Sequence, residues 1–485
     1  MKVEVLSHAC MLITDNDSSI ITDPWLLGSA YWRSWWNYPK AVYDEEKIKS
    51  VDAVVISHIH WDHWHGATLK KYFLDKQFII PDEPGVRSEN DLRSIGISKI
   101  ARLRNGETFQ VKKLKVRLYQ FGLYLNDSAV IIESENSKIL NANDAKIAGA
   151  SLASLLKREG EIDLAFRSHS TANARACQRV RDSNQTFDDN EHYLRSFKFF
   201  MDKVKPKYAI PFASNHCHLH EDVMKFNSII SNPFVLDTFL NDVEKRWRFE
   251  VMLPGSTWND RSGFTHRYGK EVFLNLDEKL IAYQDEVAPL LERQKLREDK
   301  VNIDERLITK FLQLLPKAKS VPKKYQRPVL FRLTYPSLPA VYYQLDCTTG
   351  TFEFNQIRKP VTVAGPEIIM PALIFRDAVL KNMFHHAAIS KRCEYLGDNI
   401  ADLRVVAYWQ SQLEKRELIG RAGLDTKYLW RTAVRYLKRL PELRVYIKAF
   451  LLLRIFRRPI YHVEELILRE KWTDQGMTGV SISDR

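Results

Sequence analysis

Residues 57–66 read Ser57-His58-Ile59-His60-Trp61-Asp62-His63-Trp64-His65-Gly66 and follow directly on the apolar run Asp52–Ile56. A continuous apolar run predicts a strand buried on both faces, and α/β proteins often place their sites on the loop after such a strand. Of the 14 histidines in the chain, four fall within this loop. Scattered surface or core histidines would not give this density, so we expect a metal site here.

The spacing of the side chains in this loop suits two metal ions lying side by side. His58 and His60 are two residues apart, so a short extended loop can direct both at one ion. Asp62 and His63 come after a bend and can reach a second ion. Imidazole and carboxylate are ligands for zinc, iron and manganese. The sequence therefore predicts one or two divalent ions, zinc or iron, at the end of this strand.

Strand-like and helix-like segments alternate on both sides of the loop. Apolar stretches at 53–56, 116–121, 208–211 and 249–253 read as strands, and residues 145–157, 191–204 and 221–230 read as helices. Such alternation predicts an α/β layered domain.

The pattern along the chain changes three times, which predicts four parts. A metal-binding catalytic domain is expected over residues 1–275, and a charged helical connector over 276–325. A smaller α+β domain is expected over 326–420, and basic amphipathic helices over 421–485.

Composition limits the class of protein. The 485 residues are 45% hydrophobic and 27% charged, which is ordinary for a soluble globular protein of two or three domains. The cysteines are scattered without a CxxC pair, which argues against a disulfide framework and favours the reducing cytoplasm. They are Cys10, Cys177, Cys217, Cys347 and Cys393. The apolar run at 449–453 is too short to cross a bilayer.

The net charge of +13 is concentrated near the C-terminus. Residues 427–458 hold ten Lys or Arg and one acid, Glu442, which gives 10 − 1 = +9. Apolar residues recur at helical spacing within this stretch, so it is expected to form basic amphipathic helices. Such helices either lie on the inner face of an anionic membrane or pack one face on the core with solvated charges, and both readings stay open. Nucleic-acid binding is not expected, because no nucleic-acid motif accompanies the charge.

The run His58-Ile59-His60-Trp61-Asp62-His63 after a hydrophobic strand resembles the signature of the metallo-β-lactamase superfamily. Ser7-His8-Ala9 and Thr22-Asp23-Pro24-Trp25 are similar to the lactonase and N-acyl-phosphatidylethanolamine phospholipase D branches. The CMP-N-acetylneuraminic acid hydroxylase group is the nearest in likeness, through Asp23-Pro24-Trp25-Leu26, Trp35-Trp36 and Pro211-Phe212-Ala213. The resemblance covers about residues 3–260 and implies an αβ/βα sandwich with its metals at one edge.

This resemblance implies roles for particular residues. His58 and His60 would bind the first metal, Asp62 and His63 the second, and Asp144 would bridge the two. The last ligand would be a histidine after the strand at 208–211, where three candidates stand: His216, His218 and His220. Alignment on Pro211-Phe212-Ala213 favours His220.

One departure from the family pattern concerns the first metal. The family usually has a further histidine between the motif and the bridging aspartate, but this chain has none between His65 and His169. Leu123 stands about where that histidine would be. The first site is therefore incomplete or empty, or is completed by Gln120, Asn126 or another histidine.

Other polar residues are weaker candidates. Asp23 is expected either to orient the metal loop or to act as a plain cap or turn residue. His8 either faces the pocket or is structural, and His65 is expected beside the site without ligating. His169, in a loop after a predicted strand at 162–166, is a candidate acid, base or substrate contact. Six of the 11 tryptophans lie between residues 25 and 64 and either line a substrate pocket or form a packed lid.

Three functions remain open from the sequence. The leading hypothesis is a metal-dependent hydrolase acting on a phosphodiester, lactone or amide through a metal-activated water, oriented and deprotonated by Asp62 or Asp144. The second, implied by the resemblance, is an iron oxygenase acting on a nucleotide sugar or glycan. No Cys-x-His pair of the Rieske kind precedes the motif, so an electron-transfer protein would have to supply its electrons. The third is a degenerate metal domain that serves as a binding scaffold.

Overall fold

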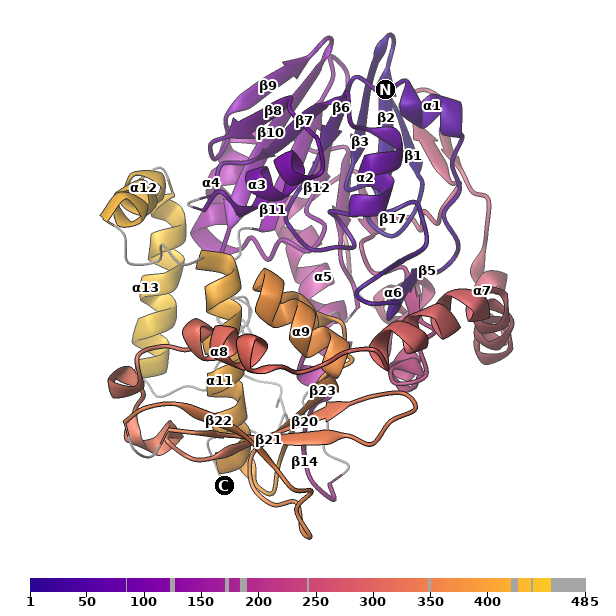
Figure 1. The fold of residues 1–485 in the computed structure, drawn as a ribbon. Coiled ribbons are helices and arrows are strands. Elements are labelled where there is room, and N and C mark those ends of the chain that lie inside the picture. The colour runs from indigo at the N-terminus through magenta and orange to yellow at the C-terminus, as the bar shows by residue number, and fades with distance from the viewer. Residues whose placement is uncertain are drawn as a thin grey trace.

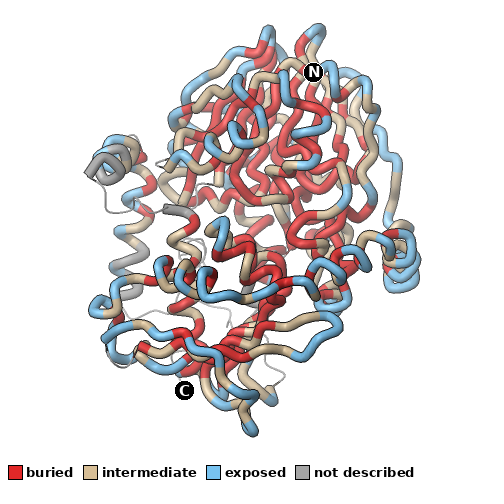
Figure 2. Tube along the Cα trace, viewed as in Figure 1, coloured by how far each residue is buried: buried red, intermediate tan, exposed pale blue. Residues whose placement is uncertain are grey.

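Two β-sheets packed face to face form one half of the molecule, and a smaller sheet with helices forms the other (Figure 1). The computed structural model describes residues 1–454 except 84, 123–126, 171–173, 184–189, 242–243, 348–349, 420–425 and 438. Figure 2 shows that buried residues concentrate along the inner segments of the chain, whereas exposed residues lie mainly on outer loops and helices.

The first sheet of the sandwich contains eight strands among the described residues. In spatial order they are β19 (Gly263–Thr265), β18 (Thr257–Asn259), β1 (Lys2–Val5), β2 (Met11–Asp15), β3 (Ser18–Thr22), β6 (Ala53–Val55), β7 (Gln77–Pro81) and β8 (Ile100–Leu103). From β3 to β8 the strands are parallel, which is why their apolar runs are continuous.

The second sheet of the sandwich contains seven strands among the described residues. In spatial order they are β17 (Arg248–Phe249), β15 (Tyr208–Pro211), β13 (Leu164–Arg167), β12 (Lys138–Asn141), β11 (Asp127–Glu133), β10 (Leu114–Phe121) and β9 (Thr108–Val111). Strands β12, β13, β15 and β17 are parallel. The inner faces of both sheets contribute Val, Ile and Leu side chains to one shared core.

Helices cover both outer faces of the sandwich. The outer face of the first sheet carries α1 (Glu45–Lys49), α2 (Gly66–Tyr72) and α3 (Arg87–Ser94). The outer face of the second sheet carries α4 (Gly149–Glu159), α5 (Asn190–Val204) and α6 (Pro233–Asn241). The predicted α/β fold, an αβ/βα sandwich, is therefore confirmed.

The second half of the molecule is a mixed sheet with helices on it. Its sheet runs in the order β14 (Gln178–Val180), β24 (Glu394–Gly397), β23 (Glu367–Pro371), β20 (Val329–Thr334), β21 (Val341–Asp346) and β22 (Glu353–Ile357). Its core includes side chains of α8 (Glu305–Leu314), α9 (Ala372–Lys381), α10 (Phe384–Ile389) and α11 (Ile400–Ile419). Helix α7 (Leu276–Glu298) precedes them, and α12 (Thr426–Leu437) and α13 (Leu440–Arg454) follow.

Two structural features connect the two halves of the molecule, and the sequence pattern predicted neither of them. Strand β14 comes from the first 275 residues but pairs with β24 in the C-terminal sheet. A small sheet of β16 (His216–His218), β5 (Trp35–Asn37) and β4 (Ser29–Ala30) joins the predicted ligand segment to the tryptophan-rich segment. In the part of the chain that the structure describes, no helix combines the length and apolar character that a bilayer crossing needs.

Candidate metal centre

The carboxyl ends of parallel strands from both sheets supply most of the polar side chains of this centre. Strands β3 and β6 are parallel neighbours in the first sheet, and they lead to Asp23 and to the metal loop, residues 57–65. Strand β12, a parallel neighbour of β13, leads to Asp144 in the second sheet. Because parallel strands end at the same edge, these side chains converge although they are far apart in sequence.

The first ligand set consists of His58, His60 and Asp127, whose ligand atoms all lie within 4.8 Å of one another. The Nε2 atom of His58 lies 2.8 Å from Nδ1 of His60. The Oδ1 atom of Asp127 lies 3.9 Å from the same Nε2 atom. Two imidazoles and one carboxylate therefore face a common point.

Asp127 is the third member of the first ligand set, for which the sequence offered no histidine. It opens β11 and pairs with Phe121 in the adjacent strand β10, which brings it to the metal edge. Leu123 and Asn126 lie outside the described residues. Gln120 is directed away, since its side-chain nitrogen donates to the carbonyl oxygen of Leu103.

The second ligand set consists of Asp62, His63 and Asp144, with His8 beside them. The Nε2 atom of His63 lies 3.5 Å from Oδ2 of Asp62 and 3.4 Å from Oδ2 of Asp144. His8 places its Nε2 atom 3.1 Å from Oδ2 of Asp62. His58, His63 and Asp144 also form a group within 4.8 Å, so Asp144 stands between the two sets. His8 thus faces the centre.

Several buried ligand atoms have no hydrogen-bond partner in the described structure. They are Oδ1 of Asp127, Oδ1 of Asp144 and Nδ1 of His8, while Nε2 of His63 and Nε2 of His8 have only carboxylate oxygens of the ligand sets near them. Leaving buried polar atoms unsatisfied costs free energy, and metal ions would satisfy these atoms together. The donor set of imidazoles and carboxylates has the chemistry that divalent zinc or iron requires, so the residues fit a metal pair.

Burial and neighbouring charges act in opposite directions on these groups. Burial raises the pKa of Asp127 to about 7, and the nearby carboxylate of Asp144 adds to this rise. Burial would also raise the pKa of Asp62, but His63 and His8 hold it well below its usual range. Burial lowers the pKa of His58 well below its usual value, which keeps its ring nitrogens available as neutral ligands.

The carboxylate of Asp23 orients the metal loop through hydrogen bonds to Ser57 and His63. It accepts hydrogen bonds from the backbone N–H of Ser57 at 2.7 Å and from the Ser57 hydroxyl at 2.7 Å. It also lies 2.9 Å from Nδ1 of His63, which fixes the tautomer that leaves Nε2 directed at the second ligand set. Asp23 thus holds the ring of a ligand in place without itself reaching the metal position.

We expect an Asp23→Asn variant to bind the second metal about 10–100-fold more weakly, because the amide cannot hold Ser57 and His63 together. Competition with a chromophoric chelator measures this affinity. An Asp260→Asn variant is the control, since Asp260 binds the N-terminal amine at the opposite end of β1. Equal affinities of the two variants would show that Asp23 does not orient His63.

The C-terminal half contributes to the centre through helix α10. His385 places its Nε2 atom 2.8 Å from Nε2 of His60. On its other side, Nδ1 of His385 lies 3.6 Å from a carboxylate oxygen of Glu414 on α11. His386 anchors the helix, because its ring bonds to Glu417 and, at 3.1 Å, to the carbonyl oxygen of Ile59 in the metal loop. No sequence signal linked this helix to the loop, since more than 300 residues separate them.

The structure does not bring His220 into the ligand sets. Its charged neighbours include Arg392 and Asp222, and burial with Arg392 nearby lowers its pKa to about 4. His216 lies closer to the centre, because its ring is 5.4 Å from that of His8 and stacks on Trp35 at 3.9 Å. Of the three candidates after β15, His216 therefore lies beside His8, and none of the three belongs to a ligand set among the described residues.

His169 and His65 both lie outside the ligand sets. His169 is fully buried, and burial lowers its pKa to about 3, which favours the neutral imidazole over the imidazolium at neutral pH. This direction disfavours His169 as an acid, and its predicted roles as a base or substrate contact stay predictions. His65 is the N-cap of α2 and accepts from the backbone of Thr68, which agrees with a place beside the centre.

The residues of the metal loop that are not ligands line a pocket of about 510 Å³. Trp61 and Trp64 of the loop contribute to its wall, together with Tyr31 and Trp32. The other predicted aromatics differ, since Trp25, Trp35 and Trp36 are almost completely buried and pack in the interior. The tryptophan cluster is therefore partly a packed layer and partly a pocket wall.

Comparison with known families places this centre in a recognised domain. Residues 2–192 match the family model described as a β-lactamase superfamily domain. This match includes the metal loop, Asp127 and Asp144, and it agrees with the two-sheet sandwich.

Curated relatives match parts of the chain. The cytidine monophosphate-N-acetylneuraminic acid hydroxylase of Mus musculus is 30% identical over 151 residues, which are 30% of this chain and 26% of the hydroxylase. A "Putative Rieske 2Fe-2S iron-sulfur protein" of Mycobacterium tuberculosis is 26% identical over 334 residues, 61% of this chain and 62% of that protein. The chain thus spans about a quarter of the hydroxylase.

Among solved structures, an isothiocyanate hydrolase from Delia radicum gut bacteria is 14% identical to this chain and has a TM-score of 0.40. The match covers 53% of this chain and 98% of that chain.

Proposed function

Because this chain has a metallo-β-lactamase fold with two His/Asp ligand sets at one edge, we propose that it is an iron-dependent oxygenase that hydroxylates an organic substrate. The observation that carries this proposal is the composition of the first set, His58, His60 and Asp127. Two histidines and one carboxylate are the ligands typical of non-haem iron(II) oxygenases. A three-histidine set would have suited zinc and hydrolysis better.

The relatives support this direction. The 30% identical relative is named as a hydroxylase, and the mycobacterial relative is named as an iron–sulfur protein. Both names refer to redox chemistry, whereas the sequence alone had favoured hydrolysis. The identity covers only part of each protein, so the substrate of those proteins is not carried over to this chain.

Bound iron would supply the activation of dioxygen, in the overall reaction R–H + O₂ + 2e⁻ + 2H⁺ giving R–OH + H₂O. The chain itself fixes the ligands and excludes water from them. The Tyr31 hydroxyl donates to Oδ1 of Asp62 at 2.5 Å and accepts from the backbone N–H of Trp61 at 3.1 Å. This arrangement leaves Oδ2 of Asp62 for the metal position. His58, His63 and Asp62 are all buried, so the centre lies in a region of low water content.

The two electrons must come from a second protein or domain that carries a redox group. The five cysteines are all buried and single, and they do not form a close Cys/His group of the Rieske kind in the described residues. An electron-transfer partner is therefore part of the proposal. Its class is a one-electron carrier such as an iron–sulfur protein.

Oxygen uptake tests the proposal. We expect anaerobically reduced, iron-loaded protein, freed of excess reductant, to consume dioxygen when mixed with aerated buffer in an electrode cell. The protein loaded with zinc should consume none, because zinc has no redox chemistry. A His58→Ala variant given the same amount of iron is the control for free iron, and equal uptake by this variant would contradict the proposal.

Hydrolysis is the second candidate, because residues 2–192 match a β-lactamase superfamily domain and β-lactamases are hydrolases. Zinc-loaded protein that cleaves lactone or phosphodiester substrates, together with no oxygen uptake by the iron form, would select hydrolysis. The scaffold hypothesis requires that neither activity is found. Turnover that His58→Ala or Asp62→Ala abolishes in a folded protein would exclude the scaffold.

A further inference from the structure

Helices α12 and α13 carry large apolar side chains on their solvent faces. Among the described residues, seven of 16 exposed large hydrophobic side chains fall within the 22 residues 430–451. They are Trp430, Val434, Leu437, Leu440, Leu443, Ile447 and Leu451. Trp430 is 71% exposed and Leu437 is 65% exposed. Single exposed apolar residues are common on soluble proteins, but a concentrated patch of this kind marks an interaction surface.

The exposed residues of α13 lie on one face. At 3.6 residues per turn, its four exposed apolar residues share an arc of about 80°, and that arc is opposite Val445. Val445 is buried in the core beneath α4. The inner face of α13 therefore packs on the sandwich, while an equally apolar outer face has no cover among the described residues.

Helix α12 is held by polar contacts and presents its apolar face outward. Arg435 makes two hydrogen bonds to Asp82, at 2.9 Å and 2.7 Å, which fasten the helix to the sandwich. Trp430, Val434 and Leu437 are spaced four and three residues apart, so they share the same side of the helix. Figure 1 shows α12 and α13 at one edge of the molecule, far from α7.

Basic residues predominate in the sequence of this segment. Residues 427–458 contain ten basic residues against Glu442 alone, and that glutamate is buried in an ion pair with Arg439. Arg444 is exposed and has no acidic partner among the described residues. The surface thus combines an apolar stripe with an exposed cation, Arg444, that no acidic group of the described residues neutralises.

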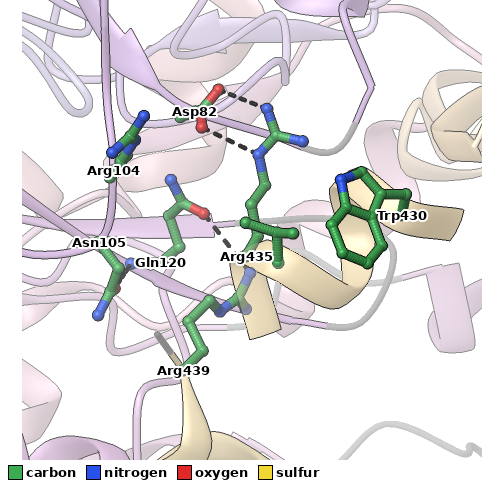
Figure 3. Close-up of a pocket in the computed structure, with 8 residues that line it drawn as sticks. Asp82, Arg104, Asn105, Gln120, Trp430, Arg435 and Arg439 are labelled. Carbon is green, nitrogen blue, oxygen red and sulfur yellow. Dashed lines mark hydrogen bonds and ion pairs between the residues drawn. The ribbon is translucent and has the colours of Figure 1, made fainter. Parts of the chain in front are cut away.

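A pocket of about 220 Å³ opens beside Trp430 and Val434, and its polar wall holds three arginines, Asn105 and Gln120, with the carboxylate of Asp82 paired to Arg435 (Figure 3). Arg104 is exposed in it without an acidic partner among the described residues, and Nη1 of Arg435 is buried without a hydrogen-bond partner. Asn105 uses its oxygen to accept from the backbone of Gln120, which leaves its amide nitrogen as a donor. A phosphate group is the kind of ligand that such a wall of donors would bind.

From the exposed apolar stripe and its basic surroundings, we propose that the outer face of α12 and α13 docks on an anionic membrane surface, with a lipid phosphate in the pocket beside Trp430. Amphipathic helices that bury apolar side chains at the headgroup boundary while basic residues meet anionic lipids have this composition. The proposal is independent of the reaction at the metal centre.

Charge complementarity favours a lipid surface over other occupants. A second copy of the chain would bring the same basic surface against this one, and like charges oppose such contact. A nucleic acid would match the charge but would leave Leu443, Ile447 and Leu451 in contact with water or phosphate. Anionic lipid alone offers both negative charge and an apolar layer.

Co-sedimentation of the full chain with vesicles tests the proposal. We expect binding to vesicles of phosphatidylcholine mixed with phosphatidylglycerol, and much weaker binding to phosphatidylcholine alone. A Leu443→Glu/Ile447→Glu variant should bind the mixed vesicles at least about tenfold more weakly, because it places two charges in the apolar stripe. An Arg104→Gln variant should lose part of the preference for anionic lipid.

The matched control is a Leu274→Glu/Leu338→Glu variant, which alters two leucines that are 60% and 51% exposed elsewhere on the molecule. It should bind like the unaltered chain, and thermal unfolding should be unchanged in both double variants. Equal vesicle binding by the two double variants, or no binding by the unaltered chain, would overturn the proposal. Self-association without vesicles that Leu443→Glu/Ile447→Glu removes would also overturn it, because a second copy would then cover the face.

Discussion

An Asp127→Ala variant is expected to lose the first metal and nearly all turnover while it remains folded. Asp127 supplies the single carboxylate of the first ligand set, and its removal leaves only His58 and His60 at that position. Two ligands hold a divalent ion poorly, so the loss of affinity should exceed the 10–100-fold that removal of an outer partner of a ligand costs. Element analysis of the purified variant should find about one ion per chain fewer than in the unaltered protein.

A histidine at the same position tests the metal preference of the first ligand set. Asp127→His would create the three-histidine set that is usual in the superfamily, so it should retain metal but shift its preference from iron toward zinc. Asp52→Asn is a suitable control, because Asp52 has a similar partial exposure but pairs with Lys112 away from the centre. Asp127→Ala with unchanged metal content would mean that another residue completes the first set.

A His385→Ala variant is expected to weaken metal binding at the first set by about 10–100-fold, although His385 belongs to the C-terminal half. When Nδ1 of His60 faces the metal position with His58, its Nε2–H donates to His385 at 2.8 Å. The contact between His385 and Glu414 holds that acceptor in place. Loss of the acceptor would free the ring of His60 to rotate and would raise the metal dissociation constant.

Metal affinity and spectroscopy separate this positioning role from a purely structural one. His385→Gln keeps an acceptor atom, so it should bind the metal more tightly than His385→Ala. If His385 served only for packing, the two variants would bind the metal equally weakly. The absorption spectrum of cobalt-substituted protein should change with His385→Ala, because the geometry at His60 changes. His266→Ala, at an exposed histidine that is paired with Glu250, is the control. Identical spectra and affinities for all three variants would contradict the role.

The sequence predicted the sandwich and the core of the metal loop because both depend on local patterns. The run Asp52–Ile56 and residues 57–65 place a buried strand and its ligands within fourteen residues. Asp144 was also predicted, as the bridging carboxylate that the family resemblance implies. These features need no knowledge of distant contacts.

Asp127 and His385 could not be predicted because their positions depend on contacts between distant segments. Asp127 reaches the centre through the antiparallel register of β10 and β11, in which it pairs with Phe121. His385 arrives only when the C-terminal half packs on the metal loop. The histidine after β15 depends on a related contact, because the three-residue strand β16 pairs with β5 and brings His216, not His220, toward His8.

Secondary structure beyond the sandwich was predicted less well. Residues 221–230 were expected to form a helix, but the structure has a 3-10 helix only at Met224–Ile229. Asp222 in this segment pairs with Arg392 of the C-terminal half, and such a tertiary contact outweighs local helix preference. The strand expected at 249–253 is limited to Arg248–Phe249, which pairs with β15 over two residue pairs at the sheet edge.

The metal content of protein purified without oxygen distinguishes an iron oxygenase from a zinc hydrolase. We expect iron, at about two ions per chain, held by the His58, His60 and Asp127 set and by the Asp62, His63 and Asp144 set. Element analysis of the same preparation, in parallel with His58→Ala, measures both identity and number. Zinc in place of iron in the unaltered chain would contradict an iron centre at these residues. Retention of no metal by either protein would contradict it as well.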